Sequence, residues 1–286
     1  MIKKYIGIFV YFLISFVAFH APDIFAKEIT SKQLGYISYT EEGKGEPLIL
    51  IHAFPTDQRL WQAQRAGLNK YFHVITLDLW GFGSSSSTNG QAVTMIEFAD
   101  EVKQLLRQLH IQKAIIGGES MGGYVALAFL QRYPESVAGL ILSDTQSIAD
   151  SAEVKKKREL VAETVLTQGP AQLINDFMPK ALSPNAPLAL RQSLRDILDG
   201  QSVTGMASAL RGMGLREDTS KVLAATSLPI LILTGDQDTV IAPQQSQYMH
   251  TLARNSRLVT ITNAGHLSSL EQPEQWNKAV INMFYQ

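Results

Sequence analysis

The chain has 286 residues, of which 45% are hydrophobic and 18% are charged, an ordinary composition for a globular protein with a sizeable core. Its formal net charge is −1, so we expect no nucleic-acid partner and no electrostatic attachment to a membrane surface. The chain contains no cysteine, which excludes disulfides, thiolate metal sites and a lipid-modified cysteine.

The first 26 residues have the form of a secretory signal peptide. A basic start, Lys3-Lys4, precedes an almost continuous apolar run over residues 5–19, and Ala26 is a small residue at a cleavage position. The apolar run is shorter than the roughly 20 residues that a spanning helix needs. We therefore expect an exported protein, periplasmic or secreted, with no stable membrane partner once the leader is cleaved. An uncleaved N-terminal membrane anchor is the alternative.

Strand patterns alternate with helical patterns over most of the remaining chain. The expected strands cover residues 35–40, 47–52, 72–78, 114–117, 139–144, 229–234 and 257–261. The expected helices cover 95–109, with a capping box from Thr94 and Glu97, the segment from Ser120 to before Pro134, and two segments that begin at Pro243 and Pro273. This alternation predicts an α/β fold whose mostly parallel central sheet has helices on both faces.

Between residues 145 and 228 the alternation lapses, because helical patterns continue there without a convincing buried strand. We interpret 145–228 as a helical cap inserted between two parts of one core, residues 27–144 and 229–286. The basic cluster at 155–158 is interpreted as a solvated helix face. Apolar cap residues at helical spacing are interpreted as core, with substrate contact as the alternative; they are Phe177, Met178, Leu182, Met206, Leu210 and Met213.

The segment Gly118-Glu119-Ser120-Met121-Gly122 follows an apolar strand pattern and precedes a helical one. In this context G-x-S-x-G predicts a sharp strand-to-helix turn with the Ser120 hydroxyl exposed at its apex, as a nucleophile requires. The two glycines lack Cβ atoms and allow strand and helix to approach closely. A glycine-rich turn that merely joins two elements is the alternative.

A serine nucleophile needs a base, and the base needs an orienting acid. His266 follows the last predicted strand and is the expected base, although a structural loop histidine is the alternative. Asp238, in the loop after the preceding strand, is the expected acid, with Asp144 as a fallback. Asp236 is interpreted as a turn residue that bonds nearby backbone amides.

The oxyanion formed in such a reaction needs fixed hydrogen-bond donors. The amide of Met121, directly after the nucleophile, is one expected donor. The amide of Phe54, in the loop after the strand at 47–52, is the other. His52 in the same loop is interpreted as a structural brace, with a role as second base as the alternative.

Together these residues resemble the α/β-hydrolase superfamily over essentially the whole mature chain. Within it, the chain is similar to 3-oxoadipate enol-lactonases and small carboxylesterases. Two positions depart from the family pattern: Ala53 stands where glycine is usual, and Trp80 stands where arginine usually anchors the following loop. The matching segments are His52-Ala53-Phe54-Pro55, Asp78-Leu79-Trp80-Gly81-Phe82-Gly83-Ser84, Gly118-Glu119-Ser120-Met121-Gly122-Gly123, Gly235-Asp236-Gln237-Asp238 and Gly265-His266.

The resemblance implies a serine hydrolase that cleaves small-molecule carboxylic esters or lactones through an acyl-enzyme. No metal or organic cofactor is expected, because the six histidines lack ligand spacing and no glycine-rich phosphate loop is present. Two alternatives stay open: an acyltransferase or perhydrolase with the same triad, and a non-catalytic small-molecule receptor. The residues do not predict an oligomeric state.

Overall fold

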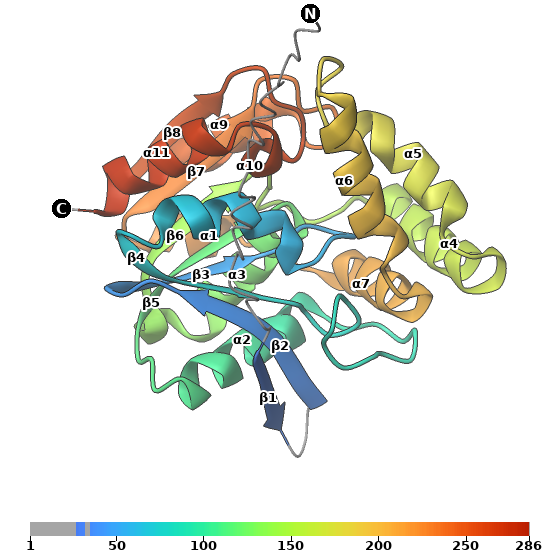
Figure 1. Cartoon of the computed structure of the whole chain (residues 1–286), viewed down its shortest axis with the longest axis horizontal. Helices are drawn as coiled ribbons and strands as arrows, with labels where there is room; N and C mark the ends of the chain where they lie inside the picture. Colours follow the sequence, from blue (N-terminus) through green and yellow to red (C-terminus); the bar gives the residue numbers. More distant parts are fainter. Residues whose placement is uncertain (1–26, 32–34, 286) are drawn as a thin grey trace, which may run out of the picture.

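The computed structural model describes residues 27–31 and 35–285, so the expected leader at 1–26 lies outside the described residues. The described chain forms an eight-stranded sheet (Figure 1). The strands are β1 (Lys27–Ser31), β2 (Gly35–Glu42), β3 (Glu46–Ile51), β4 (Phe72–Leu77), β5 (Ala114–Glu119), β6 (Val137–Ser143), β7 (Ile230–Gly235) and β8 (Ser256–Ile261). Their spatial order is β1-β2-β4-β3-β5-β6-β7-β8.

The sheet has an antiparallel edge and a parallel body. β1 pairs antiparallel with β2, and β2 pairs antiparallel with β4, whereas β4 to β8 are joined by parallel pairings. The predicted fold class is therefore confirmed. The sequence analysis missed β1, because Lys27–Ser31 is a five-residue edge strand without a buried-strand pattern.

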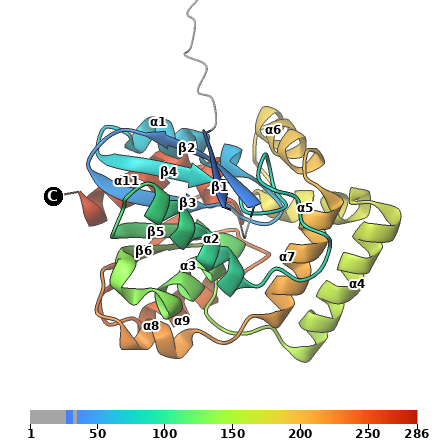
Figure 2. The ribbon, with the colours of Figure 1, turned by 90° about the horizontal axis from the view of Figure 1, so that it is seen from below.

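Helices cover both faces of the sheet (Figures 1 and 2). One face carries α2 (Met95–Gln108), α3 (Met121–Arg132) and α9 (Pro243–Leu252). The other carries the 3-10 turn η1 (Gln58–Trp61), α1 (Gln62–Leu68), α10 (Ser268–Glu271) and α11 (Pro273–Phe284). A second 3-10 turn, η2 (Pro134–Ser136), leads into β6.

The central strands are buried on both faces, which explains their continuous apolar runs. In β3, Ile49 and Ile51 pack into the core beneath α2 and α3, whereas Leu48 and Leu50 pack into the core around Trp61 and Trp276. Successive side chains of a strand point to opposite faces, so one apolar strand joins the two cores.

Helices also fill the segment between β6 and β7. They are α4 (Ala152–Gln168), α5 (Ala171–Ala181), α6 (Leu188–Asp199), α7 (Val203–Leu215) and α8 (Ser220–Ala225). Figure 2 shows α4 to α7 gathered at one end of the sheet. The short helix α8 packs instead beside α3 and α9. Within the described residues, no helix is long and apolar enough to span a membrane.

The turn between β5 and α3 places Ser120 in a strained conformation, with φ 55° and ψ −114°. The turn depends on Gly118 and Gly122. A Cβ atom at Gly118 would lie 2.1 Å from the Gly122 carbonyl group, and one at Gly122 would lie 2.1 Å from the carbonyl oxygen of Ile51. Backbone is packed on backbone here, so no side-chain adjustment would make room.

We expect Gly122→Ala to destabilise the fold by about 3 kcal/mol or more, because its new methyl group would force β3 and α3 apart. Gly214→Ala is the control: its Cβ would have no neighbour closer than 4.0 Å. Alanine there should be neutral or stabilising by about 0.5–1 kcal/mol, because Gly214 lies within helix α7. Urea unfolding followed by circular dichroism measures both changes. Equal stability of the two variants would contradict this account of the turn.

Candidate active site

Ser120, His266 and Asp238 come from three separate loops and form one buried hydrogen-bonded chain. The Ser120 Oγ atom lies 2.8 Å from His266 Nε2, and His266 Nδ1 lies 2.9 Å from Asp238 Oδ2. A carboxylate can only accept, so Nδ1 carries the ring proton and Nε2 is free to accept from the serine hydroxyl. The structure therefore brings together the three side chains that the sequence analysis selected as nucleophile, base and acid.

Asp238 is held by the backbone of its own loop. Its Oδ1 atom accepts from the amides of Val240 and Ile241, at 2.8 and 2.9 Å, which leaves Oδ2 for the histidine. These bonds fix the carboxylate before the imidazole approaches it.

The His266 loop is held from both sides. The Gly265 amide donates to Glu271 Oε2 at 2.8 Å, and the Leu267 amide donates to the carbonyl oxygen of Ala181 at 2.9 Å. The second bond connects the loop to the end of α5. Phe177, also in α5, packs edge-on against the His266 ring, with 6.3 Å between ring centroids.

The electrostatic surroundings of His266 raise its pKa above the ordinary value of 6.5. Burial alone would lower the pKa, but the carboxylate and hydrogen bond of Asp238, with the charge of Asp144, outweigh it. The site thus stabilises the imidazolium that forms when the histidine accepts a proton.

Asp144, the fallback acid, does not contact His266 through a hydrogen bond. Its Oδ1 atom accepts from the Gly235 amide at 2.7 Å, and Oδ2 accepts from the hydroxyls of Ser143 and Ser268. Burial, followed by the nearby charge of Asp238, raises the pKa of Asp144 to about 6. Asp144 therefore joins the ends of β6 and β7 to the start of α10, behind the histidine.

Asp236 and His52 bond to backbone groups. Asp236 Oδ1 accepts from the Ala264 amide at 3.2 Å, so it bonds a backbone amide as predicted, but one in the loop after β8 and not in its own turn. His52 Nδ1 donates to the carbonyl oxygen of Ala53 at 2.9 Å, and its Nε2 accepts from the Leu79 amide at 3.1 Å. Both ring nitrogens of His52 are occupied, which leaves neither free to act as a base.

The amides expected to bind an oxyanion belong to Met121, directly after Ser120, and to Phe54, in the loop after β3. Met121 is the first residue of α3, and the first amides of a helix have no intrahelical acceptor. The loop that carries Phe54 follows β3, directly beside β5, and is closed by a bond from the Thr56 amide to the Ala53 carbonyl oxygen at 2.9 Å. Phe54 and Ser120 line the same cavity. The donor roles of these two amides stay predictions.

The Gly81–Ser84 loop keeps a polar anchor although Trp80 replaces the usual arginine. Asp78 supplies it: Oδ1 accepts from the Gln58 amide at 2.8 Å, and Oδ2 accepts from the Ser84 amide at 3.0 Å. Trp80 is buried, and its amide donates to Glu101 at 3.2 Å. The departure from the family pattern does not leave this loop without support.

Glu119 is a buried polar residue that the sequence analysis did not single out. Its carboxyl group accepts from the Ser269 amide at 3.1 Å and from the Ser269 hydroxyl at 2.7 Å. Burial and the adjacent Asp144 raise its pKa well above 4.5. Glu119 thus connects the turn that carries Ser120 to α10. Since 150 residues separate the two partners, local sequence carries no signal of this contact.

The cavity at Ser120 and His266 has a volume of about 510 Å³ and is closed on one side by α4, α5 and α7. Of the six apolar cap residues considered above, Phe177, Leu210 and Met213 line it, whereas Met178, Leu182 and Met206 do not. The cap segment therefore supplies both core and cavity wall.

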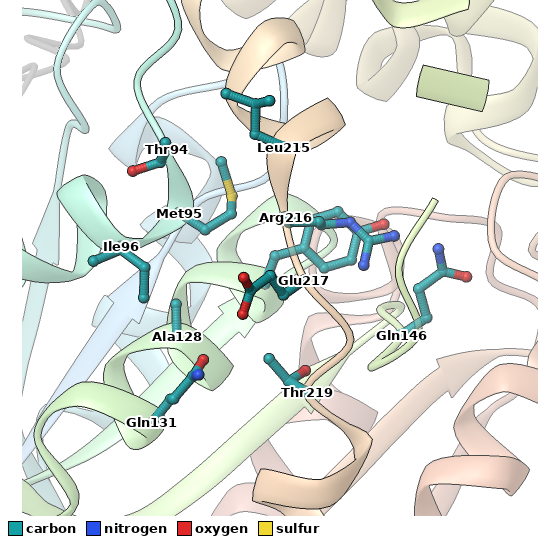
Figure 3. A pocket seen from close by; sticks show the side chains of 11 residues that line it. Thr94, Met95, Ile96, Ala128, Gln131, Gln146, Leu215, Arg216, Glu217 and Thr219 are labelled. Atoms are coloured by element: carbon teal, nitrogen blue, oxygen red, sulfur yellow. The ribbon is translucent and has the colours of Figure 1, made fainter. Parts of the chain in front are cut away.

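A smaller cavity of about 230 Å³ lies beyond Tyr124 and Gln146, which line both cavities. Figure 3 shows it, with Met95 and Ile96 on one side and Glu217 and Thr219 on the other. Arg216 lines the smaller cavity, and its guanidinium lies 4.1 Å from the centroid of the Tyr124 ring. Within the described residues, no group of three or more side chains is arranged to hold a metal ion.

The interpretation of the basic cluster at 155–158 as one solvated face is wrong for its last residue. Arg158 is only partly exposed and forms an ion pair with Asp150 at 2.5 Å. Lys157 is exposed but lines the same cavity as Ser120. The cluster is therefore divided between solvent and the cavity wall.

Comparison with known proteins identifies the family. A family model described as the alpha/beta hydrolase fold matches residues 46–273, so the chain belongs to the α/β-hydrolase family. It is 30% identical to 3-oxoadipate enol-lactonase 1 of Acinetobacter baylyi over 260 residues, 87% of this chain and 92% of that protein. These findings confirm the predicted resemblance.

Solved structures show the same relationship. A thermophilic esterase of Thermogutta terrifontis, determined with malate bound, is 35% identical and has a TM-score of 0.86, covering 90% of this chain and 97% of its own. The enol-lactonase of Burkholderia xenovorans shares the fold at 23% identity, with a TM-score of 0.82 over 90% of this chain and 99% of its own. Because these relatives include esterases and enol-lactonases, they support the classification of this protein as a hydrolase.

The raised pKa of Glu119 leads to a test of stability against pH. In the folded state Glu119 favours its protonated form, because its pKa lies well above the value of about 4.5 that it has in the unfolded chain. Its contribution to the stability of the fold therefore decreases as the pH rises above about 4.5. Glutamine has no charge to bury. We expect the melting temperature of Glu119→Gln, relative to the wild type, to increase between about pH 5 and pH 8.

Glu119→Ala is the control, because it leaves the Ser269 amide without its acceptor at every pH. It should lose about 1–3 kcal/mol of stability at both ends of the range. A difference between Glu119→Gln and the wild type that stays constant or falls with rising pH would contradict the buried, protonated carboxyl.

Proposed function

We propose that this protein is a serine hydrolase of carboxylic esters or lactones. The observation that carries the proposal is the hydrogen-bonded chain from Ser120 through His266 to Asp238, with the serine in the wall of a largely apolar cavity. A serine hydroxyl becomes an effective nucleophile when a neighbouring base removes its proton.

The proposed reaction has two halves. Ser120 attacks the substrate carbonyl while His266 Nε2 takes the hydroxyl proton, and Asp238 stabilises the imidazolium. The amides of Met121 and Phe54 bind the oxyanion. The histidine then protonates the departing alcohol, and in the second half it activates water to release the acyl group from Ser120.

The relatives support esters and lactones as the substrate class, since an esterase and enol-lactonases share the fold and up to 35% of the sequence. We also propose export of the protein, on the form of its first 26 residues. Transfer to an alcohol or a peroxide would use the same three side chains. Product analysis in the presence of competing acceptors distinguishes hydrolysis from transfer.

Replacement of the nucleophile tests the proposal. We expect Ser120→Ala to lower kcat for p-nitrophenyl esters and simple lactones by about 10³-fold or more, because the acyl-enzyme cannot form. The measurement is initial rate on the purified mature protein. A fluorophosphonate probe should label the wild type at Ser120 and leave the variant unlabelled.

Circular dichroism of Ser120→Ala controls for folding, because the variant removes only a hydroxyl group. Ligand binding without turnover by the folded wild type would favour a receptor over an enzyme. Wild-type labelling at another residue, or full activity of Ser120→Ala, would contradict the proposed nucleophile.

The raised pKa of His266 predicts the acid limb of the pH profile. The histidine must be neutral to accept the serine proton, so kcat/KM should fall as pH decreases through a midpoint above 6.5. Asp144→Asn removes a charge that raises this pKa, so the limb should move to lower pH. Asparagine can still accept from the Gly235 amide. An unchanged limb, or one moved to higher pH, would contradict the electrostatic role of Asp144.

A further inference from the structure

We propose that the cavity selects substrates that carry a carboxylate or a similar anion away from the scissile bond, with Lys157 and Arg158 as its counter-ions. The inference rests on the proposed function of Ser120 and specifies its substrate class. It starts from the placement of both cations in the cavity wall that contains Ser120 and His266.

The acidic side chain in this wall is already neutralised. Asp150 accepts from Arg158 Nε at 2.5 Å through Oδ2 and from Arg216 Nη2 at 2.8 Å through Oδ1. Burial would raise the pKa of Asp150, but the bonds and charges of the two arginines hold it below its ordinary value. Two guanidinium groups therefore face one carboxylate, and the cluster keeps a positive charge of one.

Lys157 adds a second positive charge. Its ammonium group has no hydrogen-bond or ion-pair partner within residues 27–31 and 35–285. It also lines the adjoining groove of about 480 Å³ between α4 and α5, so it lies where the two spaces meet. A cation without a partner at the mouth of a cleft attracts an anionic ligand.

Arg158 retains donors for such a ligand. Its Nε atom donates to Asp150, and its Nη1 atom makes only a weak contact with the Met213 sulfur, at 3.6 Å, among the hydrogen bonds of the described residues. Within the part of the chain that the structure describes, the Nη2 group of Arg158 makes no hydrogen bond to protein, and a guanidinium can bind a carboxylate through two adjacent nitrogens. Arg158 and Lys157 are consecutive residues of α4, above the cavity floor that carries Ser120.

The remaining wall between the cations and Ser120 is mostly apolar, with Val161, Leu173, Phe177 and Leu210 among its side chains. A substrate that fits this arrangement has an ester or lactone carbonyl at one end, a hydrocarbon spacer, and a free carboxylate at the other. Half-esters of aliphatic dicarboxylic acids have this form.

Charge-matched variants test the proposal. Lys157→Glu cancels the net positive charge of the cavity wall, whereas Lys156→Glu makes the same change of net charge at a neighbouring exposed residue outside the cavity wall. The substrates are monoethyl succinate, monoethyl adipate and the corresponding diethyl esters. The measurement is kcat/KM for each ester, with kcat and KM determined separately.

We expect the wild type to favour the half-esters over the diesters, and Lys157→Glu to reduce that preference by about tenfold, mainly through KM. Lys156→Glu should change that preference by about twofold or less, because Lys156 does not line the cavity and solvent screens its charge from a bound substrate. Addition of about 0.5 M NaCl should reduce the wild-type preference.

An equal ratio of half-ester to diester kcat/KM in the wild type and in Lys157→Glu would overturn the proposal. Equal effects of the two variants would also overturn it, because they would show that the preference depends on the net charge of the protein and not on a charge in the cavity wall. These results differ from failure of the proposed function, in which neither half-esters nor diesters would be cleaved in a manner dependent on Ser120.

Discussion

The hydrogen bond between His266 and Asp238 is the interaction on which the arrangement of the site depends. It fixes the proton on Nδ1, so that Nε2 presents a lone pair to Ser120 Oγ at 2.8 Å. Both partners are buried, and a buried charge is tolerated only with a partner and further hydrogen bonds. Backbone amides of the Asp238 loop supply those bonds. The position of the carboxylate, and therefore the orientation of the His266 ring, depends on the conformation of this loop.

A second layer of carboxyl groups holds the loops that carry this chain. Asp144 bonds to the end of β7 and to Ser268, while Glu119, the residue before Ser120, bonds to Ser269. The indole of Trp276 donates to Ser143 at 3.0 Å, beside the same group. These contacts bind α10 to the ends of the central strands. The position of His266, two residues before Ser268, therefore follows from a buried polar network as well as from its own bond to Asp238.

Three of the helices between β6 and β7, namely α4, α5 and α7, line the cavity at Ser120. The same helix, α4, supplies the cavity wall with Val161 and with the cations Lys157 and Arg158, while its other basic residues face solvent. Consecutive residues of one helix, Lys156 and Lys157, thus place one charge outside the cavity wall and the next within it. In the proposed function, the core positions the three reacting side chains, and the inserted helices determine the charge and shape of the cavity that receives the substrate.

The sequence by itself determined the alternation of strands and helices and the five motif segments, because apolar periodicity, glycine spacing and capping residues act over a few neighbours. It thereby selected Ser120, Asp238 and His266 without coordinates. The sequence did not predict β1 or the bond between Glu119 and Ser269. It also did not predict that the 155–158 cluster has some residues in solvent and others in the cavity wall. Those features depend on contacts between residues up to 150 positions apart. Only the tertiary structure determines which polar groups are buried next to one another and which side of a helix faces a cavity.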